Sequence, residues 1–252
     1  NQIYGVDFVL PFRFSEGAWQ LGTRGPISLR IAEVVNQVTV KNIAADLQGA
    51  YPWSENNPLL LSDVSADLLG GKIIMQQLRM PQHDPALLRV QNISSSELIS
   101  AVNPKQFAMS GPVSGALPLW LDNEKWIIKD GWLTNPGPMT LRIDKDTADA
   151  VVKDNMAAGA AINWLRYMEI SHSWTKINLD NLGVLTMQST VTGNSRVDGK
   201  VGTVNLNYTH EENVFTLWRS LRFGDNLQAW LEQNAALPET HCPEGKECEE
   251  QQ

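Results

Sequence analysis

Hydrophobic and polar residues alternate along most of the chain, and this pattern predicts a protein built mainly from β-strands. The clearest alternation is in Phe107–Leu121, where every odd position is apolar or glycine. A period of two places these positions on one face of a strand, and a strand of this length would span about 50 Å. We therefore expect it to curve, with Gly111 and Gly115 as bending points. Pro112 and Pro118 lack the N–H that a central strand needs, which predicts an edge, a bulge or a break.

Shorter segments with strand-like patterns lie on both sides of this one. They are separated by Gly, Pro, Asn and Asp residues, which are typical of turns, and the pair Gly70-Gly71 predicts a tight turn. The predicted strands, of which the first two form a hairpin, are Ile3–Phe14, Trp19–Leu21, Pro26–Val40, Ile43–Gly49, Leu59–Leu69, Lys72–Met80, Leu87–Ile93, Trp126–Lys129, Gly131–Leu133, Met139–Asp144, Trp174–Leu179, Val184–Gly193 and Lys200–Thr209. The sequence thus predicts a mainly β fold with a few helices, in which consecutive hairpins form a long, curved antiparallel sheet.

Three segments have helical patterns. Ser94 and Glu97 form a capping box at the start of a short helix, Ser95–Val102. A longer, alanine-rich helix is predicted over Asp146–Met168, because its first turn is acidic and its apolar residues recur at helical spacing. The last helical stretch, Val214–Leu231, is interrupted by a Gly-Asp pair. We expect these short helices to cap or flank the sheet.

The apolar face of Phe107–Leu121 is open to two interpretations. It can be ordinary core, or it can line a groove. Few helices are available to cover a strand of this length, and this favours a groove with an exposed apolar surface. The nine tryptophans are open to the same two interpretations, as core and cover for the sheet or as the lining of a groove or lipid interface.

Composition and charge narrow the range of functions. The 252 residues carry a net charge of −8 and only 19% charged residues, so the chain lacks the basic surface that nucleic-acid binding requires. No apolar run approaches the about 18 residues of a membrane span. The chain starts without an initiator Met or a signal-peptide pattern, and we expect it to be part of a longer protein. We predict one domain over residues 1–236 and an acidic tail over 237–252.

The sequence contains little that could carry catalysis. The four histidines have no metal-binding spacing, and no nucleophile elbow or phosphate-binding loop is present. We therefore predict that the protein is not an enzyme and needs no cofactor. In the tail, Cys242 and Cys248 are candidates for a disulfide in an oxidising compartment. A zinc site with His241 and two free thiols are the alternatives.

Several stretches resemble a known family. They are Met109–Leu121, continuing in Trp126–Leu133 and Met139–Ile143, together with the strand-glycine-glycine stretch Leu61–Lys72. These stretches resemble the C-terminal region of the YdbH family of AsmA-like proteins, which are related to TamB and YhdP. The resemblance extends over nearly the whole chain, but the motifs themselves have little chemical specificity.

The resemblance implies a bridge-like lipid-transfer protein without catalytic activity. Such a protein is anchored in the inner membrane by an N-terminal helix, crosses the periplasm as a curled β-sheet with an apolar lumen, and carries phospholipid toward the outer membrane. Phospholipid acyl chains are then the expected ligand. The residues that we assign to such a groove are Phe107, Met109, Val113, Leu117, Leu119, Leu121, Leu185, Met187 and Val191.

The resemblance also implies a protein partner. A small, YnbE-like outer-membrane lipoprotein would extend the sheet at its C-terminal end by strand addition. The last predicted strand, Lys200–Thr209, is available for this pairing, although the C-terminal helices and tail would compete for the same edge. Its candidate contact residues are Val201, Val204, Leu206 and Tyr208. The alternative function is a periplasmic scaffold that binds this partner without itself carrying lipid.

Overall fold

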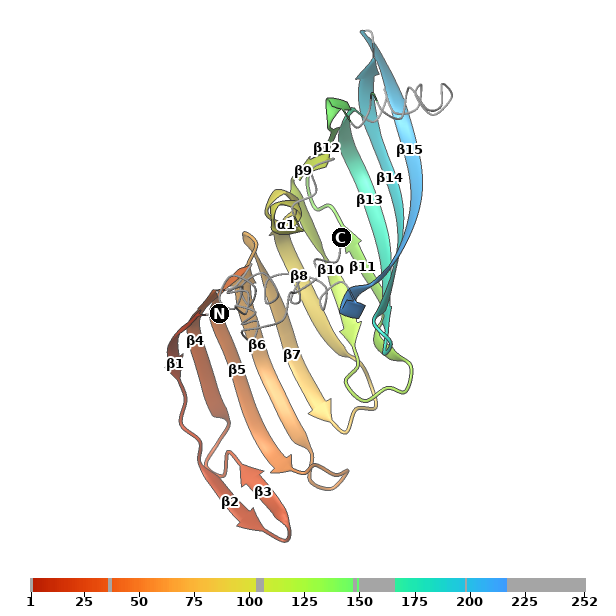
Figure 1. Ribbon diagram of the computed structural model, residues 1–252. Helices are drawn as coiled ribbons and strands as arrows, with labels where there is room; N and C mark the ends of the chain where they lie inside the picture. The colour runs from red at the N-terminus through yellow and green to blue at the C-terminus, as the bar shows by residue number, and fades with distance from the viewer. Residues whose placement is uncertain are drawn as a thin grey trace, which may run out of the picture.

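The computed structural model describes residues 2–35, 38–102, 107–146, 149, 166–197 and 199–216. Nearly all of them belong to one antiparallel sheet of 15 strands (Figure 1). The elements are β1 (Gln2–Asp7), β2 (Phe12–Ser15), β3 (Ala18–Leu21), β4 (Ile27–Val35), β5 (Thr39–Tyr51), β6 (Leu59–Leu68), β7 (Gly71–Met80), β8 (Ala86–Ser94), α1 (Ser95–Val102), β9 (Phe107–Ser110), β10 (Pro112–Leu119), β11 (Trp126–Thr134), β12 (Met139–Ile143), β13 (Tyr167–Asp180), β14 (Val184–Val197) and β15 (Lys200–Asn213).

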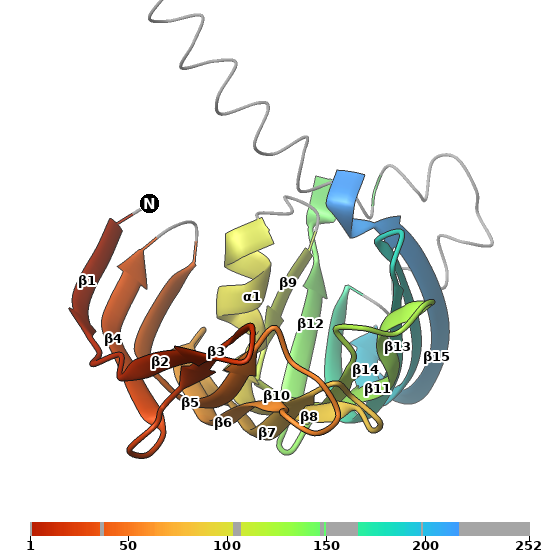
Figure 2. The same ribbon diagram turned by 90° about the horizontal axis from the view of Figure 1, so that it is seen from below.

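The strands follow one another across the sheet nearly in sequence order. The main path is β1-β4-β5-β6-β7-β8-β10-β11-β13, and β14 and β15 continue it beyond β13. Seen from below, the sheet is curved into a U, and α1 lies on its concave side (Figure 2). The predicted fold class, a mainly β protein with a large antiparallel sheet, is confirmed. The β6–β7 hairpin, which turns at Leu69 and Gly70, confirms the predicted tight turn.

Strand registers place apolar residues of neighbouring strands on one face of the sheet. Met75 on β7 pairs with Val64 on β6 and with Leu88 on β8. Leu88 in turn pairs with Leu117 on β10. Because paired residues point to the same side of a sheet, these four side chains share a face.

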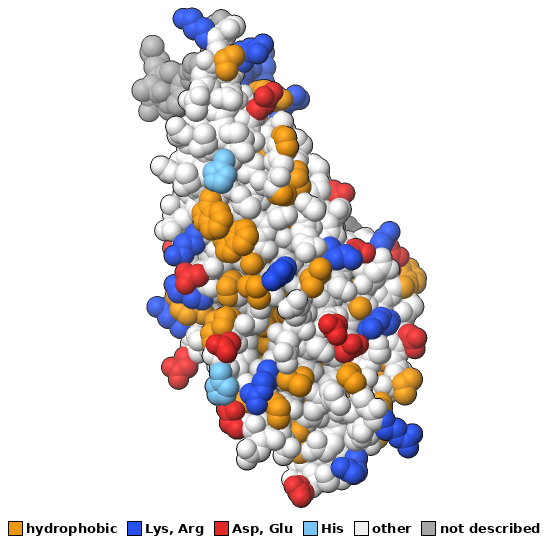
Figure 3. All heavy atoms as spheres, turned by 180° about the vertical axis from the view of Figure 1, so that it is seen from behind, with side chains coloured by type: hydrophobic (Ala, Val, Ile, Leu, Met, Phe, Trp, Pro, Cys, Tyr) orange, Lys and Arg blue, Asp and Glu red, His pale blue; other side chains and the backbone are white. Residues whose placement is uncertain are grey.

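Most of the charged residues of these strands lie on the other face. Lys72 pairs with Asp67, and Asp67 pairs with Lys41 across the next strand. From behind, the convex side of the sheet carries lysine, arginine, aspartate and glutamate side chains scattered among uncharged ones (Figure 3). The apolar face is therefore the concave one, and the U is lined with hydrophobic side chains.

The segment Phe107–Leu121 is not one continuous strand, as predicted, but two. β9 and β10 are separated at Gly111, which has a φ of 106°, and β9 pairs with β12 whereas β10 pairs with β8 and β11. The cause is α1, which begins beside the break. The Gly111 carbonyl oxygen accepts hydrogen bonds from the backbone N–H of Ser95 (3.0 Å) and from its hydroxyl (2.8 Å). The expected bend at Gly111 is thus a break that caps a helix.

The strands that pair with β10 and β9 are also separated at this point, because β11 ends before β12 begins. Asn135 fills this gap: its Oδ1 accepts hydrogen bonds from the backbone N–H (2.6 Å) and the hydroxyl (2.9 Å) of Ser173 on β13. Its Nδ2 donates to the Gly137 carbonyl at 2.9 Å. The amide thus satisfies backbone groups of β13 that would otherwise lack a strand partner.

Several predicted boundaries are wrong. Pro26–Val40 is divided between β4 and β5, and Ile3–Phe14 between β1 and β2, of which only β2 forms the predicted hairpin with β3. Conversely, Trp126–Lys129 and Gly131–Leu133 are one strand, β11, with an irregularity near Asp130. Apolar residues continue across the first two breaks, so the pattern did not divide these segments. In β11, the Asp130-Gly131 pair suggested a turn but marks only an irregularity within the strand.

The helix predictions have mixed outcomes. α1 has the predicted bounds, and its capping is confirmed because the backbone N–H of Glu97 donates to the Ser94 hydroxyl at 3.3 Å. Met168, predicted as the end of a long helix, instead belongs to β13 and is completely buried in the sheet's apolar core. Most of the rest of that predicted helix lies outside the described residues. Only residues 214–216 of the last predicted helix are described, and they are helical.

Candidate functional site

The concave face carries two hydrophobic clusters. The first, which we call the central cluster, lies on β6, β7, β8 and the end of β10. Its buried residues are Met75, Leu78, Met80 and Ala86, and the partly buried residues packed against them are Leu59, Leu61, Val64, Leu88 and Leu119. This surface is apolar throughout, because each strand contributes an aliphatic side chain at every inward position.

The second cluster, which we call the C-terminal cluster, lies on β9, β10 and β12–β15. Met139, Met168 and Ile170 are its buried residues, and Met109, Val113, Leu141, Val191 and Val204 pack against them. The methionines of the described residues, which are Met75, Met80, Met109, Met139, Met168 and Met187, all occupy positions on the concave face. Methionine is unbranched and flexible, and it adapts to ligands of irregular shape.

The structure brings most of the predicted groove residues together on this face. Met109, Val113 and Val191 belong to the C-terminal cluster, and Leu119 packs against the central cluster. Leu117 joins them through its pairing with Leu88. On β14, Leu185 and Met187 share this face because they pair with the inward residues Leu179 and Ile177 of β13.

Two of the predicted groove residues are placed differently. Leu121 lies beyond the end of β10, and its side chain is 59% exposed. The backbone of Phe107 pairs with Ile143 in β12, but its side chain lies outside the described part of the chain. The groove surface therefore extends along β10 only as far as Leu119.

The sequence analysis missed the central cluster as part of this surface. A β-bulge explains why. Asp63 on β6 has a φ of 50° and lies where the register with β5 shifts, between Ala44 and Asp46. The inward positions of β6 therefore change from odd residues, such as Leu59 and Leu61, to even ones, such as Val64 and Ala66. A strict period of two does not survive this change of phase. The aliphatic runs at the ends of these strands, such as Leu59–Leu61, were the available signal.

The candidate partner strand, β15, forms an edge of the described sheet and pairs with β14. Val204, Leu206 and Tyr208 point to the concave side, because they pair with the inward residues of β14. Val201 points to the convex side and is 62% exposed. The four residues therefore do not share one face.

Two tryptophans with described positions do not line the groove. Trp132 on β11 pairs with Lys176, and Trp174 on β13 pairs with Thr190, so both belong to the convex face. Their rings are stacked, with centroids 5.0 Å apart and planes inclined by 8°. These two tryptophans therefore cover the sheet on its convex face and do not line a groove.

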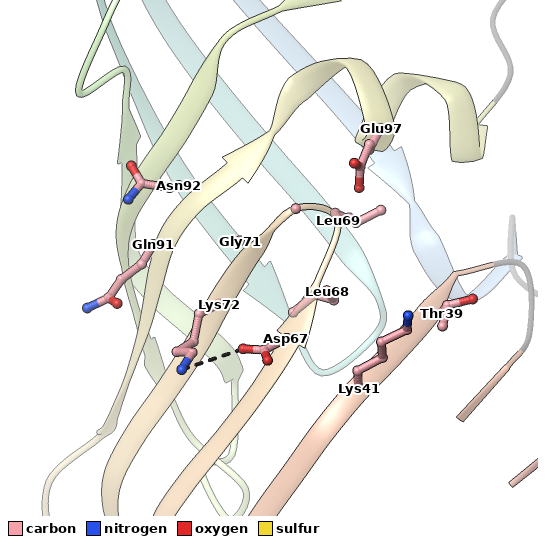
Figure 4. Close-up of a pocket in the computed structure, with 11 residues that line it drawn as sticks. Thr39, Lys41, Asp67, Leu68, Leu69, Gly71, Lys72, Gln91, Asn92 and Glu97 are labelled. Carbon is pink, nitrogen blue, oxygen red and sulfur yellow. Dashed lines mark ion pairs between the residues drawn. The ribbon is translucent and has the colours of Figure 1, made fainter. Parts of the chain in front are cut away.

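A polar hollow of about 710 Å³ lies beside the β6–β7 turn (Figure 4). Lys72 forms an ion pair with Asp67 there, at 3.5 Å. Glu97 on α1 also lines the hollow. A hydrogen bond from Asn42 (2.8 Å) and, to a lesser extent, the charge of Lys72 hold the pKa of Asp67 below its usual value. Its charged, solvated lining does not suit an apolar ligand, so the concave apolar face remains the principal candidate site.

The described residues give no sign of metal binding or of a membrane-spanning helix. Their His, Cys, Asp and Glu side chains form no group of three or more that could hold a metal ion. No helix among the same residues has the length and hydropathy needed to cross a bilayer. Cys242 and Cys248, the candidates for a disulfide, lie outside the described residues.

Comparison with known proteins identifies the family of this chain. The family model described as "YdbH-like: Intermembrane phospholipid transport protein YdbH" matches residues 1–236. The chain belongs to the YdbH-like family. The resemblance noted in the sequence is thereby confirmed, and the large antiparallel sheet with one apolar face is the structure of this YdbH-like chain.

One curated relative shows how much of a YdbH-like protein this chain represents. The "Probable phospholipid transport protein YdbH" of Escherichia coli (strain K12) is 80% identical over 252 residues, which are 100% of this chain and 29% of the relative. The chain therefore spans less than a third of the relative's length. No solved structure matches the chain.

Proposed function

We propose that this chain is a segment of a groove through which a YdbH-like protein carries phospholipid between the inner and outer membranes. The observation that carries the proposal is the apolar concave face, which extends over the central and C-terminal clusters. The whole protein would act in the periplasm, anchored in the inner membrane by an N-terminal helix. No chemical step is required, because the transported molecule is unchanged.

The physical role of the groove is to keep acyl chains out of water. Exposing one CH₂ group costs about 0.8 kcal/mol, so a long acyl chain cannot leave a membrane without an apolar surface to cover it. The U-shaped sheet is open on one side, so a headgroup can stay in water while the acyl chains contact the concave face. The methionines on that face suit chains that slide and change conformation.

Photo-crosslinking in cells tests this proposal. A photoreactive phenylalanine analogue is placed at Leu117 or Met187, which lie on the concave face. The control positions are Arg89 and Gln188, which are close by and exposed on the convex face. We expect phospholipid adducts from the concave positions and none from the convex ones. Equal labelling of both faces, or no lipid adduct from either, would contradict a lipid groove.

We further propose that β15 receives a strand from a small outer-membrane lipoprotein, which would place this segment at the outer-membrane end. Lysine and proline on an edge strand hinder pairing with other chains, and β15 has no proline and a single lysine, at its first residue, Lys200. The convex side of β15 instead carries Thr203, Asn205 and Asn207, and their side chains form hydrogen bonds with Asn194, Thr192 and Thr190 of β14 at 2.9–3.3 Å. A further strand with similar side chains could extend this ladder.

The same edge supports the second candidate function, a scaffold that binds this lipoprotein while lipid travels elsewhere. Two variants separate the functions. Met187→Glu places a charge in the groove and leaves the edge of β15 intact, whereas Leu206→Pro disturbs β15. A groove requires that Met187→Glu abolish envelope function. If Met187→Glu is tolerated and Leu206→Pro is not, the protein acts as a scaffold.

A further inference from the structure

The concave face changes character at its C-terminal end, where polar side chains form a continuous patch. Thr175 on β13 pairs with Ser189 on β14, and their hydroxyls are 2.8 Å apart. Ser189 pairs in turn with Tyr208 on β15. Along β15, His210 and Glu212 follow Tyr208 at alternate positions and therefore point to the same side. We call these five residues the polar patch.

The three residues on β15 are joined to one another. The Tyr208 hydroxyl lies 3.1 Å from His210 Nδ1, and the two rings are stacked with centroids 6.0 Å apart. His210 Nε2 lies 3.5 Å from Glu212 Oε2. The side chains of His210 and Glu212 are 37% and 42% exposed, and Tyr208 is 52% exposed. A ligand in the groove can therefore reach a hydroxyl, an imidazole and a carboxylate in one line.

Apolar residues lie directly beside the polar patch on the same face. His210 pairs with Met187, and Glu212 pairs with Leu185. In the other direction along β15, Leu206 follows Tyr208 and pairs with Val191 of the C-terminal cluster. Polar groups next to apolar surface are what an amphiphile with a polar headgroup and long acyl chains requires.

The charges of the patch favour one class of headgroup. The salt bridge that Glu212 forms within the described residues is with His210, so its carboxylate is not neutralised by a lysine or arginine there. A carboxylate attracts an ammonium group and repels a headgroup whose only charge is a phosphate. The Tyr208 hydroxyl and the His210 imidazole can donate to the phosphate of the same headgroup when the ligand replaces their contacts with each other and with Glu212.

We propose that Tyr208, His210 and Glu212 bind the headgroup of an amine-bearing phospholipid while its acyl chains contact the neighbouring apolar residues. This inference rests on the proposed lipid-groove function. The ammonium group lies at Glu212, and the phosphate lies at Tyr208 and His210. The segment thereby selects phosphatidylethanolamine over phosphatidylglycerol at the C-terminal end of the described sheet.

The test compares the lipids that a photoreactive residue at Leu185, which pairs with Glu212, captures in the full-length natural protein. The ratio of phosphatidylethanolamine to phosphatidylglycerol is measured by mass spectrometry and divided by the same ratio in the source membrane. We expect the wild-type protein to be enriched in phosphatidylethanolamine. Glu212→Lys should lower the ratio about tenfold, which corresponds to about 1.4 kcal/mol, with total bound lipid unchanged. Tyr208→Phe keeps the ring and removes the hydroxyl, and it should lower the ratio in the same direction by less.

Glu211→Lys is the matched control, because it makes the same charge change one residue away on the convex face. It should leave the ratio at the wild-type value. An equal change in both lysine variants would overturn the site, because it would show a non-specific effect of net charge. An unchanged ratio in Glu212→Lys, with normal total lipid, would also overturn it and leave the groove intact. Absence of lipid from the wild-type protein would overturn both proposals.

Discussion

The central and C-terminal clusters occupy the same concave face but are supported by different convex surfaces. Behind the central cluster, the neighbouring strands carry ion pairs, such as Lys72 with Asp67 at 3.5 Å and Arg30 with Asp46 at 3.3 Å. Behind the C-terminal cluster, Lys176 on β13 still pairs with Asp130 on β11 at 3.2 Å, but β14 and β15 carry an uncharged ladder of threonine and asparagine side chains. Charged residues suit a surface that stays in water, whereas an uncharged ladder suits an edge that another strand can extend.

The concave sides of the two regions also differ, in how many polar side chains they carry. Inward positions of the central cluster are aliphatic on every strand, whereas the wall formed by β13–β15 includes the polar patch beside its aliphatic residues. The comparison indicates a division of roles along one groove. The central region supplies apolar surface for acyl chains, and the C-terminal region adds polar contacts and an available edge.

The largest effect is expected from a charge in the central cluster. Met75→Asp places a carboxylate among buried aliphatic side chains without a partner, which should lower the free energy of unfolding by about 3–5 kcal/mol. Ile74→Asp, at the next position on the convex face, is the control and should change it little. Chemical denaturation monitored by circular dichroism measures both variants. Equal losses in the two variants would show that the faces do not differ as described.

A smaller effect is expected where the two regions meet on β10. A Cβ at Gly115 would overlap the backbone carbonyl oxygen of Trp132 on β11, so Gly115→Ala must push the two strands apart. We expect a loss of about 1–3 kcal/mol, which is typical of overpacking. At Gly137, a Cβ would meet only Pro112 Cγ at 3.7 Å, and Gly137→Ala should be tolerated. Thermal unfolding of the two alanine variants distinguishes them, and a stable Gly115→Ala would contradict the close contact.

The sequence predicted this fold well where clear turns bound the apolar segments. The strands of the β6–β7 hairpin and of β14 were located within a few residues, because a glycine-containing turn lies beside each of them. Met168 was assigned to a helix because an alanine-rich run precedes it, but burial in the C-terminal cluster places it in β13. Local propensity is overridden there by tertiary packing.

The part of the candidate site that could be predicted is the part where apolar and polar residues alternate regularly. Groove residues such as Val113 and Met187 follow a strict alternation, whereas Leu59 and Val64 lie on the same face only because a bulge at Asp63 separates them. The polar patch could not be predicted in this way. Its members become neighbours only through the register between β13, β14 and β15, and a sequence pattern contains no information on cross-strand register for residues so far apart.

The smallest expected effect concerns the charged convex side of the central region. The pKa of Asp67 is lowered chiefly by the hydrogen bond from Asn42, and Lys72 contributes less. Because the folded pKa of Asp67 lies below its usual value, the ionised carboxylate stabilises the protein above that usual value, and this contribution is lost as the pH falls through the folded pKa. Carboxyl NMR titration should show the Asp67 pKa rising toward its usual value in Asn42→Ala, and rising less in Lys72→Ala. A larger rise in Lys72→Ala would mean that the ion pair, and not the hydrogen bond from Asn42 on β5, sets the pKa of Asp67.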